Sequence, residues 1–293
     1  MRILITGARG QVGSAAARLL ADTGHHEVLA VDRHQCDLVS RDSVEQVVGT
    51  FAPDLIINGA AHTNVDGCES DQDAAFAVNG LGVRYLAAAA NRVDAHIVHI
   101  STDYVFDGRS AVPYDEWHPT NPQSVYGTSK LAGEVELMAH ANHWTIARTA
   151  WVYGNGKNFV DTIISKARDG QSLTVVDDQR GCPTFAADLA AMLITLGTGR
   201  RSGMFHVTNQ GSCSWFDLAR VALALVDLEP DIVSPMSSSE LNRPAPRPAN
   251  SVLDNRALRL GGVPLLRPFH DALADYLDVA PLSPDRLAAL GVA

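Results

Sequence analysis

Tyr126 and Lys130 are the two residues of this sequence whose types and spacing point most directly to chemistry. They stand four positions apart in the run Tyr-Gly-Thr-Ser-Lys, so on a helix their side chains lie on one face. A tyrosine ordinarily keeps its proton up to about pH 10. A neighbouring ammonium stabilises the phenolate and lowers the pKa of the phenol towards working pH. The pair therefore predicts proton delivery to a substrate oxygen.

A hydroxyl group precedes this pair at the end of an apolar run. The segment His96-Ile-Val-His-Ile100 is typical of a buried strand, and Ser101 and Thr102 follow it directly. A hydroxyl there can donate to the carbonyl oxygen under reduction and polarise it as the tyrosine proton arrives. Lys130 can also reach the ribose of a nicotinamide cofactor. The chemistry that this order of residues favours is hydride transfer.

Three glycines near the N-terminus predict a dinucleotide-binding turn. Gly7, Gly10 and Gly13 follow the apolar segment 2–6 and open a helical pattern. Glycines at this spacing let the backbone turn tightly and approach a pyrophosphate, which the first amides of the helix then face. The position between a strand and a helix is the context that makes such a turn specific.

The next strand leaves the identity of the cofactor open. The segment 28–31 ends in Asp32 and Arg33. Asp32 would accept hydrogen bonds from the adenosine ribose of NADH, whereas Arg33 would hold the 2′-phosphate of NADPH. We therefore expect either NADPH or NADH.

Alternating strand-like and helical segments predict the fold that positions these residues. Short apolar runs typical of strands lie at 3–6, 28–31, 55–58, 97–100 and 145–149. Segments with helical spacing or alanine-rich composition lie between them, at 11–23, 43–50, 72–91 and 124–140. Continuous apolar strands joined by helices indicate an α/β fold with a doubly wound parallel sheet of the Rossmann type.

The pattern loosens after Trp151, which suggests a second, smaller domain. We expect a dinucleotide-binding domain over residues 1–150, to which 185–208 returns, and a smaller α/β substrate-binding domain over 151–293. The proline-rich stretch 243–248 is expected to be an ordered loop, because proline fixes the backbone and removes a donor.

Composition excludes several classes of partner. The 293 residues are 46% hydrophobic and 19% charged, which is enough for a large core, and the net charge of −10 opposes binding to nucleic acid or to an anionic membrane. No apolar run approaches the ~20 residues that span a bilayer. No signal peptide is evident, so we expect a cytoplasmic protein. The four cysteines contain no Cys-x-x-Cys pair and are expected to be reduced, buried thiols.

Several motifs resemble the dTDP-4-dehydrorhamnose reductase family of the extended short-chain dehydrogenases. Besides the glycine turn, they are the runs at 60–63, 101–106, 126–134, 148–153, 178–184 and 247–251. The resemblance extends from residue 1 to about residue 255. It implies NAD(P)H-dependent reduction of the 4-keto group of dTDP-4-dehydro-6-deoxy-L-mannose to dTDP-L-rhamnose, with a dTDP-sugar as the substrate.

The resemblance also implies roles for individual residues. The residues that should line the dinucleotide are Gly10, Gln11, Val12, Asp32, Asp37, Leu38, Ala61, His62, Thr63 and Ile100. Thr102, Asp103 and Trp151 should touch the sugar, with the indole as an apolar wall against the deoxysugar methyl. Gln179 and Arg247 are candidates for the diphosphate end of the substrate, since a guanidinium forks onto phosphate oxygens. Both are equally explained as loop-stabilising residues.

One departure from the family concerns metal. Some members are described as dimers that magnesium bridges through acidic side chains, one of them early in the first helix. Residues 14–17 here read Ser-Ala-Ala-Ala, and Ala186 and Ala187 precede Asp188 in the later loop. We therefore expect no structural metal, and a monomer or a weak dimer.

Three alternative functions can be set against reduction of dTDP-4-dehydro-6-deoxy-L-mannose. The first is a sugar-nucleotide dehydratase or epimerase; such dehydratases carry Thr-Asp-Glu after the fourth strand, and here Tyr104 stands in place of the glutamate. A catalytically silent, cofactor-binding regulatory subunit would be free to lose Thr102, Tyr126 or Lys130, and all three are present. A reductase of another dTDP-4-ketosugar in secondary metabolism is not distinguished by the sequence.

Overall fold

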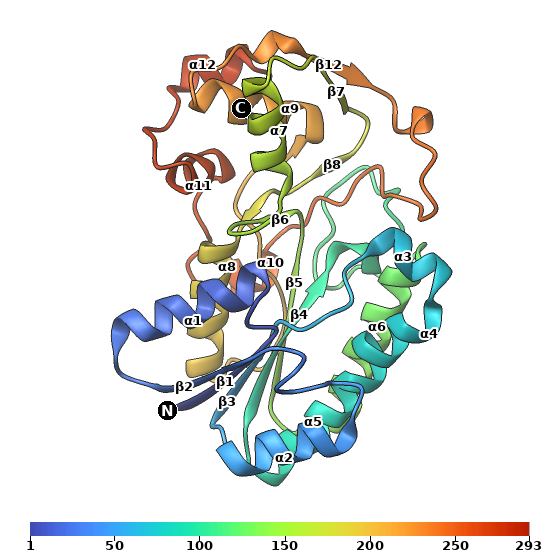
Figure 1. The fold of residues 1–293 in the computed structure, drawn as a ribbon, viewed down its shortest axis with the longest axis vertical. Helices are drawn as coiled ribbons and strands as arrows, with labels where there is room; N and C mark the ends of the chain where they lie inside the picture. The colour runs from blue at the N-terminus through green and yellow to red at the C-terminus, as the bar shows by residue number, and fades with distance from the viewer. Residues whose placement is uncertain (293) are drawn as a thin grey trace.

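Six parallel strands form the central sheet of the N-terminal part (Figure 1). The computed structural model describes residues 1–292. The strand order is β10-β5-β4-β3-β1-β2, and every neighbouring pair is parallel. The bounds are β1 (Arg2–Thr6), β2 (Glu27–Val31), β3 (Leu55–Asn58), β4 (His96–Thr102), β5 (Trp144–Thr149) and β10 (Gly203–His206). The predicted doubly wound parallel sheet is confirmed.

The apolar runs of the inner strands are continuous because both faces of the sheet are covered. Side chains alternate between the faces along a strand. Leu4 and Ile56 therefore lie in the core on one face, and Ile3, Ile5 and Ile57 lie in the core on the other. All five are fully buried.

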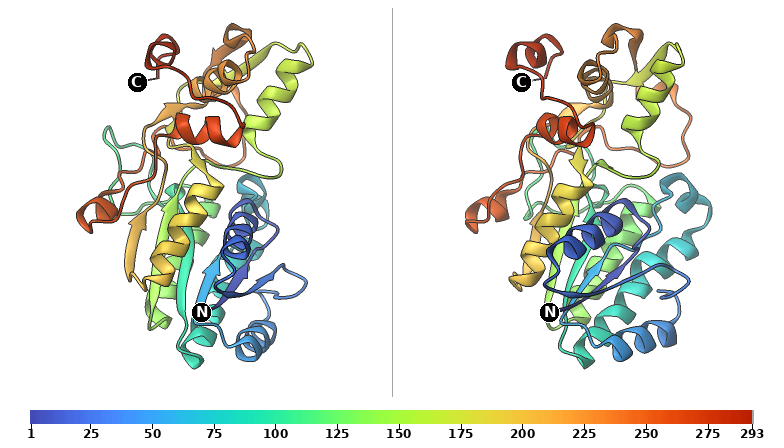
Figure 2. Two further views of the ribbon diagram at one scale, coloured as in Figure 1. Left: turned by 90° about the vertical axis from the view of Figure 1, so that its left-hand side faces the viewer. Right: turned by 60° about the vertical axis from the view of Figure 1, so that its left-hand side comes forward.

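Two groups of helices cover the two faces (Figures 1 and 2). Helix α1 (Gln11–Thr23) packs beside α8 (Ala186–Thr198) on one face. On the other face, α5 (Gly82–Arg92) packs between α2 (Arg41–Phe51) and α6 (Val125–His140). Helix α8 and strand β10 are thus part of the first layered unit, although they follow residue 150 in the chain.

The helix predicted over 72–91 is interrupted. The chain forms α4 (Gln72–Phe76), a π-helical turn η1 (Ala77–Leu81) and then α5, after an additional short helix α3 (Val65–Ser70). Buried Asn79 lies in the π-helical turn, where its amide accepts from the backbone N–H of His62 at 2.8 Å and donates to its carbonyl at 3.1 Å. A π-turn inside a helix often marks a functional site, and this one holds the loop after β3.

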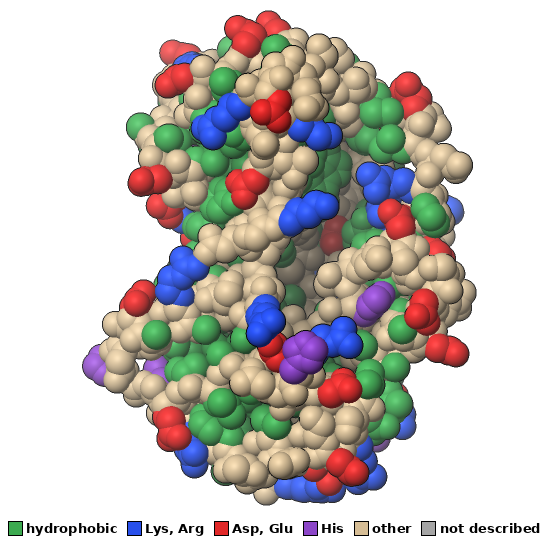
Figure 3. All heavy atoms as spheres, viewed as in Figure 1, with side chains coloured by type: hydrophobic (Ala, Val, Ile, Leu, Met, Phe, Trp, Pro, Cys, Tyr) green, Lys and Arg blue, Asp and Glu red, His purple; other side chains and the backbone are tan. Residues whose placement is uncertain are grey.

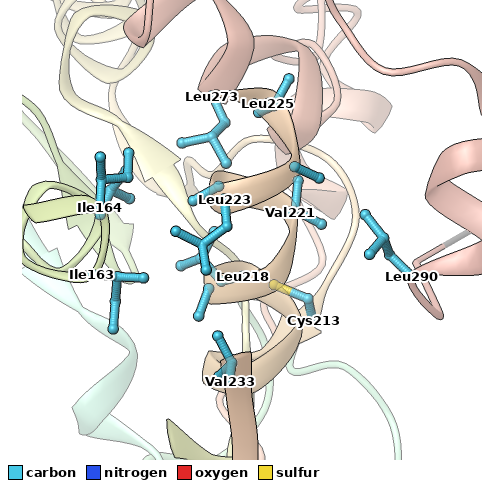
Figure 4. Close-up of a cluster of buried hydrophobic side chains, with 14 of the residues drawn as sticks. Ile163, Ile164, Cys213, Leu218, Val221, Leu223, Leu225, Val233, Leu273 and Leu290 are labelled. Atoms are coloured by element: carbon cyan, nitrogen blue, oxygen red, sulfur yellow. The ribbon is translucent and has the colours of Figure 1, made fainter. Parts of the chain in front are cut away.

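The C-terminal part packs around α9 (Trp215–Leu225), whose Leu218, Val221 and Leu223 are buried together with Leu273 (Figure 4). Its other helices are α7 (Phe159–Arg168), α11 (Phe269–Tyr276) and α12 (Pro284–Ala289). Helix α10 (Arg256–Leu260) packs instead against β10, and its buried Leu258 belongs to the core on the α1 and α8 face of the large sheet. Its short strands are β6 (Val152–Tyr153), β7 (Leu173–Val176), β8 (Arg180–Gly181), β9 (Thr184–Phe185), β11 (Cys213–Ser214) and β12 (Val233–Met236). Two short 3₁₀ turns, η3 (Pro230–Ile232) and η4 (Ser238–Glu240), flank β12, and a third, η2 (Asp103–Val105), follows β4.

Two further findings concern the residues that the structure describes. All four cysteines are buried and free, as predicted. Within residues 1–292, no helix has the length and apolar character needed to cross a membrane.

Candidate active site

The glycine turn between β1 and α1 is shaped as the sequence predicts. Gly7 has a φ of +70°, a conformation that residues with a side chain rarely adopt. A Cβ on Gly13 would collide with the carbonyl oxygen of Gly7, so the helix approaches the turn as closely as only glycine allows. Gly10 begins α1 without a side-chain cap, which leaves its first amides available to an anion. The turn is a cradle that fits a dinucleotide pyrophosphate.

Asp32 lies beside this turn, because Ala8 N–H donates to the Val31 carbonyl at 3.1 Å. Its carboxylate accepts from the His34 backbone N–H at 2.8 Å, and this bond is the main reason that its pKa is lowered. Its ionic partner is Arg9, at 2.8 Å, rather than the neighbouring Arg33. Arg9 is not among the residues predicted from the sequence; its position between Gly7 and Gly10 is the signal that could have indicated it.

The other predicted cofactor residues follow the carboxyl ends of adjacent strands, and so lie along the same edge of the sheet as the glycine turn. They are Gln11 and Val12 at the start of α1, Asp37 and Leu38 after β2, Ala61, His62 and Thr63 after β3, and Ile100 within β4. The parallel order of β2, β1, β3 and β4 brings these segments together, although they are far apart in the sequence.

Thr102 and Tyr126 lie where the end of β4 meets the start of α6. Thr102 is the last residue of β4, and Tyr126 is the second residue of α6. Ser124 caps the helix by accepting from the Gly127 N–H at 3.1 Å. A Cβ on Gly127 would collide with the Tyr104 carbonyl, so the helix start lies directly against the turn that follows Thr102. The Tyr126 ring lies edge-on to that of Tyr104, 5.5 Å between centroids, and the Thr102 hydroxyl is close enough to influence the ionisation of Tyr126.

The pKa of Tyr126 is raised, whereas the sequence predicted that Lys130 would lower it. Burial is the main cause of the rise, and the Thr102 hydroxyl opposes it only in part. The predicted lowering is therefore wrong for the protein without ligand, because burial destabilises the phenolate. Lys130 is itself buried, and its Nζ donates to the Ile100 carbonyl at 2.7 Å. Burial lowers the pKa of Lys130 to about 8, with Glu134 acting in the opposite direction.

Asp103 is a buried carboxyl group at the same junction. It accepts from the Thr102 hydroxyl at 2.9 Å, and its second oxygen is buried without a partner. Burial raises the pKa of Asp103 to about 6, although the hydrogen bond from Thr102 opposes the rise. Asp103 Oδ2 is therefore a free acceptor on the carboxyl group that the Thr102 hydroxyl contacts.

Trp151 has an unusual backbone and a stacked side chain. Its φ is +47°, and its indole stacks on Trp215 with ring centroids 3.7 Å apart. A Cβ on Gly181 would collide with the indole, so the ring lies directly on the backbone of β8. Trp215, at the start of α9, was not singled out from the sequence. The two rings form an aromatic wall between the first and second parts of the chain.

Arg247 lines a cavity of about 220 Å³, together with Tyr104, Phe106, Arg109 and Ser124. Its guanidinium pairs with Asp66 at 3.0 Å and lies 6.0 Å from the centre of the Tyr104 ring. One of its nitrogens, Nη1, is buried without a partner. Gln179 is half-buried and is not among the residues that line this cavity. Figure 3 shows the hollow between the two parts, with basic side chains along its edge.

A buried ion pair supports the back of α6. Arg148 of β5 contacts Glu134 at 2.7 Å, and Ser101 donates to the same carboxylate at 2.5 Å. Glu134 and Arg148 are almost completely buried. The sequence motif contained Glu134, but its partner on another strand could not be read from it. The pair fixes the rotation of α6, which carries Tyr126 and Lys130.

Among residues 1–292, no three His, Cys, Asp or Glu side chains are grouped so that they could hold a metal ion. Asp188, the acidic residue discussed for the later loop, instead forms an ion pair with Arg267 at 2.8 Å.

Residues 1–281 match the protein family described as the RmlD substrate binding domain. Among similar curated proteins, the Bacillus subtilis spore coat polysaccharide biosynthesis protein SpsK is 41% identical, covering 94% of this chain and 96% of its own. The Mycobacterium tuberculosis dTDP-4-dehydrorhamnose reductase is 41% identical, covering 94% and 92%. A probable dTDP-4,6-dihydroxy-2-methyloxan-3-one 4-ketoreductase of Streptomyces antibioticus is 40% identical, covering 99% and 97%.

The chain is also similar to solved structures of proteins named dTDP-4-dehydrorhamnose reductase. A dTDP-4-dehydrorhamnose reductase of Clostridium acetobutylicum has a TM-score of 0.92 and 41% identity, covering 95% of this chain and 99% of its own. The Bacillus anthracis dTDP-4-dehydrorhamnose reductase in complex with NADP also has a TM-score of 0.92, with 37% identity and coverage of 94% and 98%.

Proposed function

Because this chain belongs to the dTDP-4-dehydrorhamnose reductase family, we propose that it reduces the 4-keto group of dTDP-4-dehydro-6-deoxy-L-mannose to give dTDP-L-rhamnose. The observation that carries the proposal is the close packing of the start of α6 against the turn after Thr102, which brings Tyr126 near that hydroxyl with Lys130 one helical turn behind. Two neighbouring hydroxyls can both reach one carbonyl oxygen, which is the arrangement that a ketone reduction requires.

A nicotinamide cofactor supplies the hydride for this reaction. The glycine turn and the uncapped start of α1 would hold its pyrophosphate, and the segments after β2 and β3 would hold its adenosine half. Asp32 favours the free ribose hydroxyls of NADH. Arg9, which pairs with Asp32, and Arg33, which follows Asp32 in the sequence, favour the 2′-phosphate of NADPH. We therefore propose that both cofactors are accepted.

Tyr126 is the acid in the proposed reaction. Its raised pKa keeps the phenol protonated at neutral pH, so it can donate to the oxyanion that develops at carbon 4. Thr102 stabilises that oxyanion by donating a hydrogen bond. When ionised, Lys130 stabilises the phenolate that remains, and it can return a proton to Tyr126 before the next turnover.

The sugar nucleotide would lie across the hollow between the two parts. Trp151, supported by Trp215, offers an apolar face to the deoxysugar methyl. Asp103 offers an unpaired acceptor to a sugar hydroxyl. Arg247, with an unpaired nitrogen, is the proposed contact for the diphosphate. We retain Gln179 as a second proposed contact at that end of the substrate.

The test is incubation of the protein with NADPH or NADH and a panel of dTDP-4-ketosugars. The expected result is cofactor oxidation and a product with the mass and stereochemistry of dTDP-L-rhamnose. Reduction of a different ketosugar in preference would support a specialised reductase, to which the 40% identity with the Streptomyces antibioticus protein gives weight. No oxidation of either cofactor with any sugar would favour a silent cofactor-binding subunit.

We also propose that the enzyme is a monomer or a weak dimer that needs no magnesium. The residues early in α1 that would have to carry a carboxylate are serine and alanine. A chelator should therefore leave the turnover and the sedimentation mass unchanged, and a loss of either would contradict this proposal.

A further inference from the structure

A chain of buried hydrogen bonds connects Lys130 to the strand that carries the glycine turn. Lys130 Nζ lies 3.2 Å from His99 Nε2, and His99 Nδ1 lies 2.9 Å from Asn58 Nδ2. Thr6 donates to Asn58 Oδ1 at 2.6 Å. The four residues come from α6, β4, β3 and β1, and each is no more than 2% exposed. The proposed reaction uses only Lys130 of these four.

The amide of Asn58 determines which group donates and which accepts in this series of hydrogen bonds. Its oxygen accepts from Thr6 and also from the Ala60 backbone N–H at 3.3 Å. Its NH₂ group therefore faces His99, and His99 Nδ1 must be the acceptor. A neutral imidazole has one N–H, so that hydrogen is on Nε2 and points at Lys130.

An N–H group that points at Lys130 discriminates between its two protonation states. An ammonium has three donors and no acceptor, whereas a neutral amine has a lone pair that can accept. We infer that His99 is a positioning residue which, held by Asn58 and Thr6, presents an N–H to Lys130 and favours its neutral amine over its ammonium form. Through this contact His99 would bring Lys130 close to the balance between proton donor and acceptor that a relay requires.

Several other charged groups around α6 have partners of their own. Tyr126 and Glu134 flank Lys130 on α6, and Glu134 is paired with Arg148 of β5. Elements packed against α6 contribute Arg84 of α5, paired with Glu136; Glu69 of α3, which accepts from the Val125 N–H; and Asp103 of η2, which accepts from Thr102. Burial holds the pKa of His99 well below its usual value, in agreement with a neutral imidazole.

The composition of the chain makes a direct test possible. Lys130, Lys157 and Lys166 are its three lysines, and the last two are exposed. In protein labelled with ¹³C at lysine Cε, the titration of each amine can be followed by NMR without cofactor or substrate. The Lys157 and Lys166 signals serve as internal references for an exposed lysine.

The decisive variant is His99→Gln. A glutamine amide can turn its oxygen towards Lys130 and accept from the ammonium, so the Lys130 titration should rise by about one pH unit. Asn58→Asp should act in the same direction, since a carboxylate next to Nδ1 can only accept, which turns the Nε2 lone pair towards Lys130. The folded state of each variant is checked by far-UV and near-UV circular dichroism.

The matched control is His96→Gln. His96 is equally buried on the same strand, but it contacts Thr145 at 2.7 Å, not Lys130. This variant should leave the Lys130 titration unchanged. The inference is overturned if His99→Gln leaves the titration where the wild-type protein has it or lowers it, or if His96→Gln raises it as much.

The role of His99 as a positioning residue rests on the proposed function. The Lys130 titration can be measured whether or not that function is correct. If no dTDP-ketosugar is reduced while the Lys130 titration rises as expected, the proposed function fails and the His99 contact stands. If the sugars are reduced but the Lys130 titration in His99→Gln does not rise, the proposed function stands and the inference about His99 fails.

Discussion

The indole of Trp151 occupies the space in which Gly181 has no side chain. The two residues lie on different segments of the chain, one after β5 and the other in β8. Trp215 closes the other face of the indole, at a centroid distance of 3.7 Å. The orientation of the aromatic wall therefore depends on the absence of a single methyl group.

We expect Gly181→Ala to displace this indole and impair sugar binding. The new methyl must push the ring away from β8, so kcat/KM for the sugar should fall by up to about 10²-fold. Cofactor binding, measured by fluorescence titration, should not change. Gly49→Ala on α2 is the control, because a Cβ there meets no atom within 4 Å. Equal losses of kcat/KM in the two variants would show that Trp151 does not contribute to substrate binding.

We expect Tyr126→Phe to lower kcat by about 10²–10⁴-fold, the range typical of a lost general acid. The ring remains to pack against Tyr104, so the dissociation constant of NADPH should be nearly unchanged. Tyr85→Phe on α5 serves as a control for the loss of a phenol outside the proposed site. Turnover at the wild-type rate in Tyr126→Phe would remove the proposed proton donor.

We expect Glu134→Gln to destabilise the protein strongly. The change leaves the Arg148 guanidinium buried without its counter-charge, which costs about 3–5 kcal/mol. The free energy of unfolding can be measured by urea denaturation. Glu45→Gln removes a partly exposed carboxylate that pairs with the exposed Arg41 and Arg92, and should change the free energy of unfolding far less. Similar losses in both variants would contradict a special role for the buried pair.

We expect Asp103→Asn to alter how stability depends on pH. Between its ordinary pKa of 3.8 and about 6, the folded protein keeps a proton on Asp103 that the unfolded chain has lost. Asp103 therefore destabilises the fold progressively as the pH rises through that range. Relative to the wild type, the variant should gain up to about 3 kcal/mol between pH 4 and pH 7 in urea unfolding.

Asp107→Asn provides a control of opposite sign. The hydrogen bond from Tyr114 lowers the pKa of Asp107, so its stabilising contribution is present above the ordinary pKa and is lost as the pH falls through the lowered one. The deficit of this variant should therefore shrink towards low pH. A relative stability of Asp103→Asn that does not vary with pH would show that its carboxyl is not titrating in this range.

The glycine turn, the buried strands and the helix that carries Tyr126 and Lys130 could be predicted from short stretches of sequence. Gly7, Gly10 and Gly13 permit the tight turn and the close approach of helix to turn, because they have no side chain, and the apolar runs of β1, β3 and β4 require a sheet that is covered on both faces. Tyr126 and Lys130 are four residues apart on one helix, so their shared face follows from the helical repeat. The residue-by-residue roles in binding and catalysis remain predictions, as does the domain boundary near residue 150.

Tertiary structure decided the partners and the ionisation states. His99 contacts Lys130, Arg9 contacts Asp32, and Trp215 stacks on Trp151 because separate segments of the chain meet there. The sequence shows that these residues are present, but it does not show which of them are in contact in the folded protein. The raised pKa of Tyr126 has the same origin, because it depends on how much water the whole fold excludes from one hydroxyl. The sequence by itself determined which groups could act, and packing determined the protonation states in which they are held.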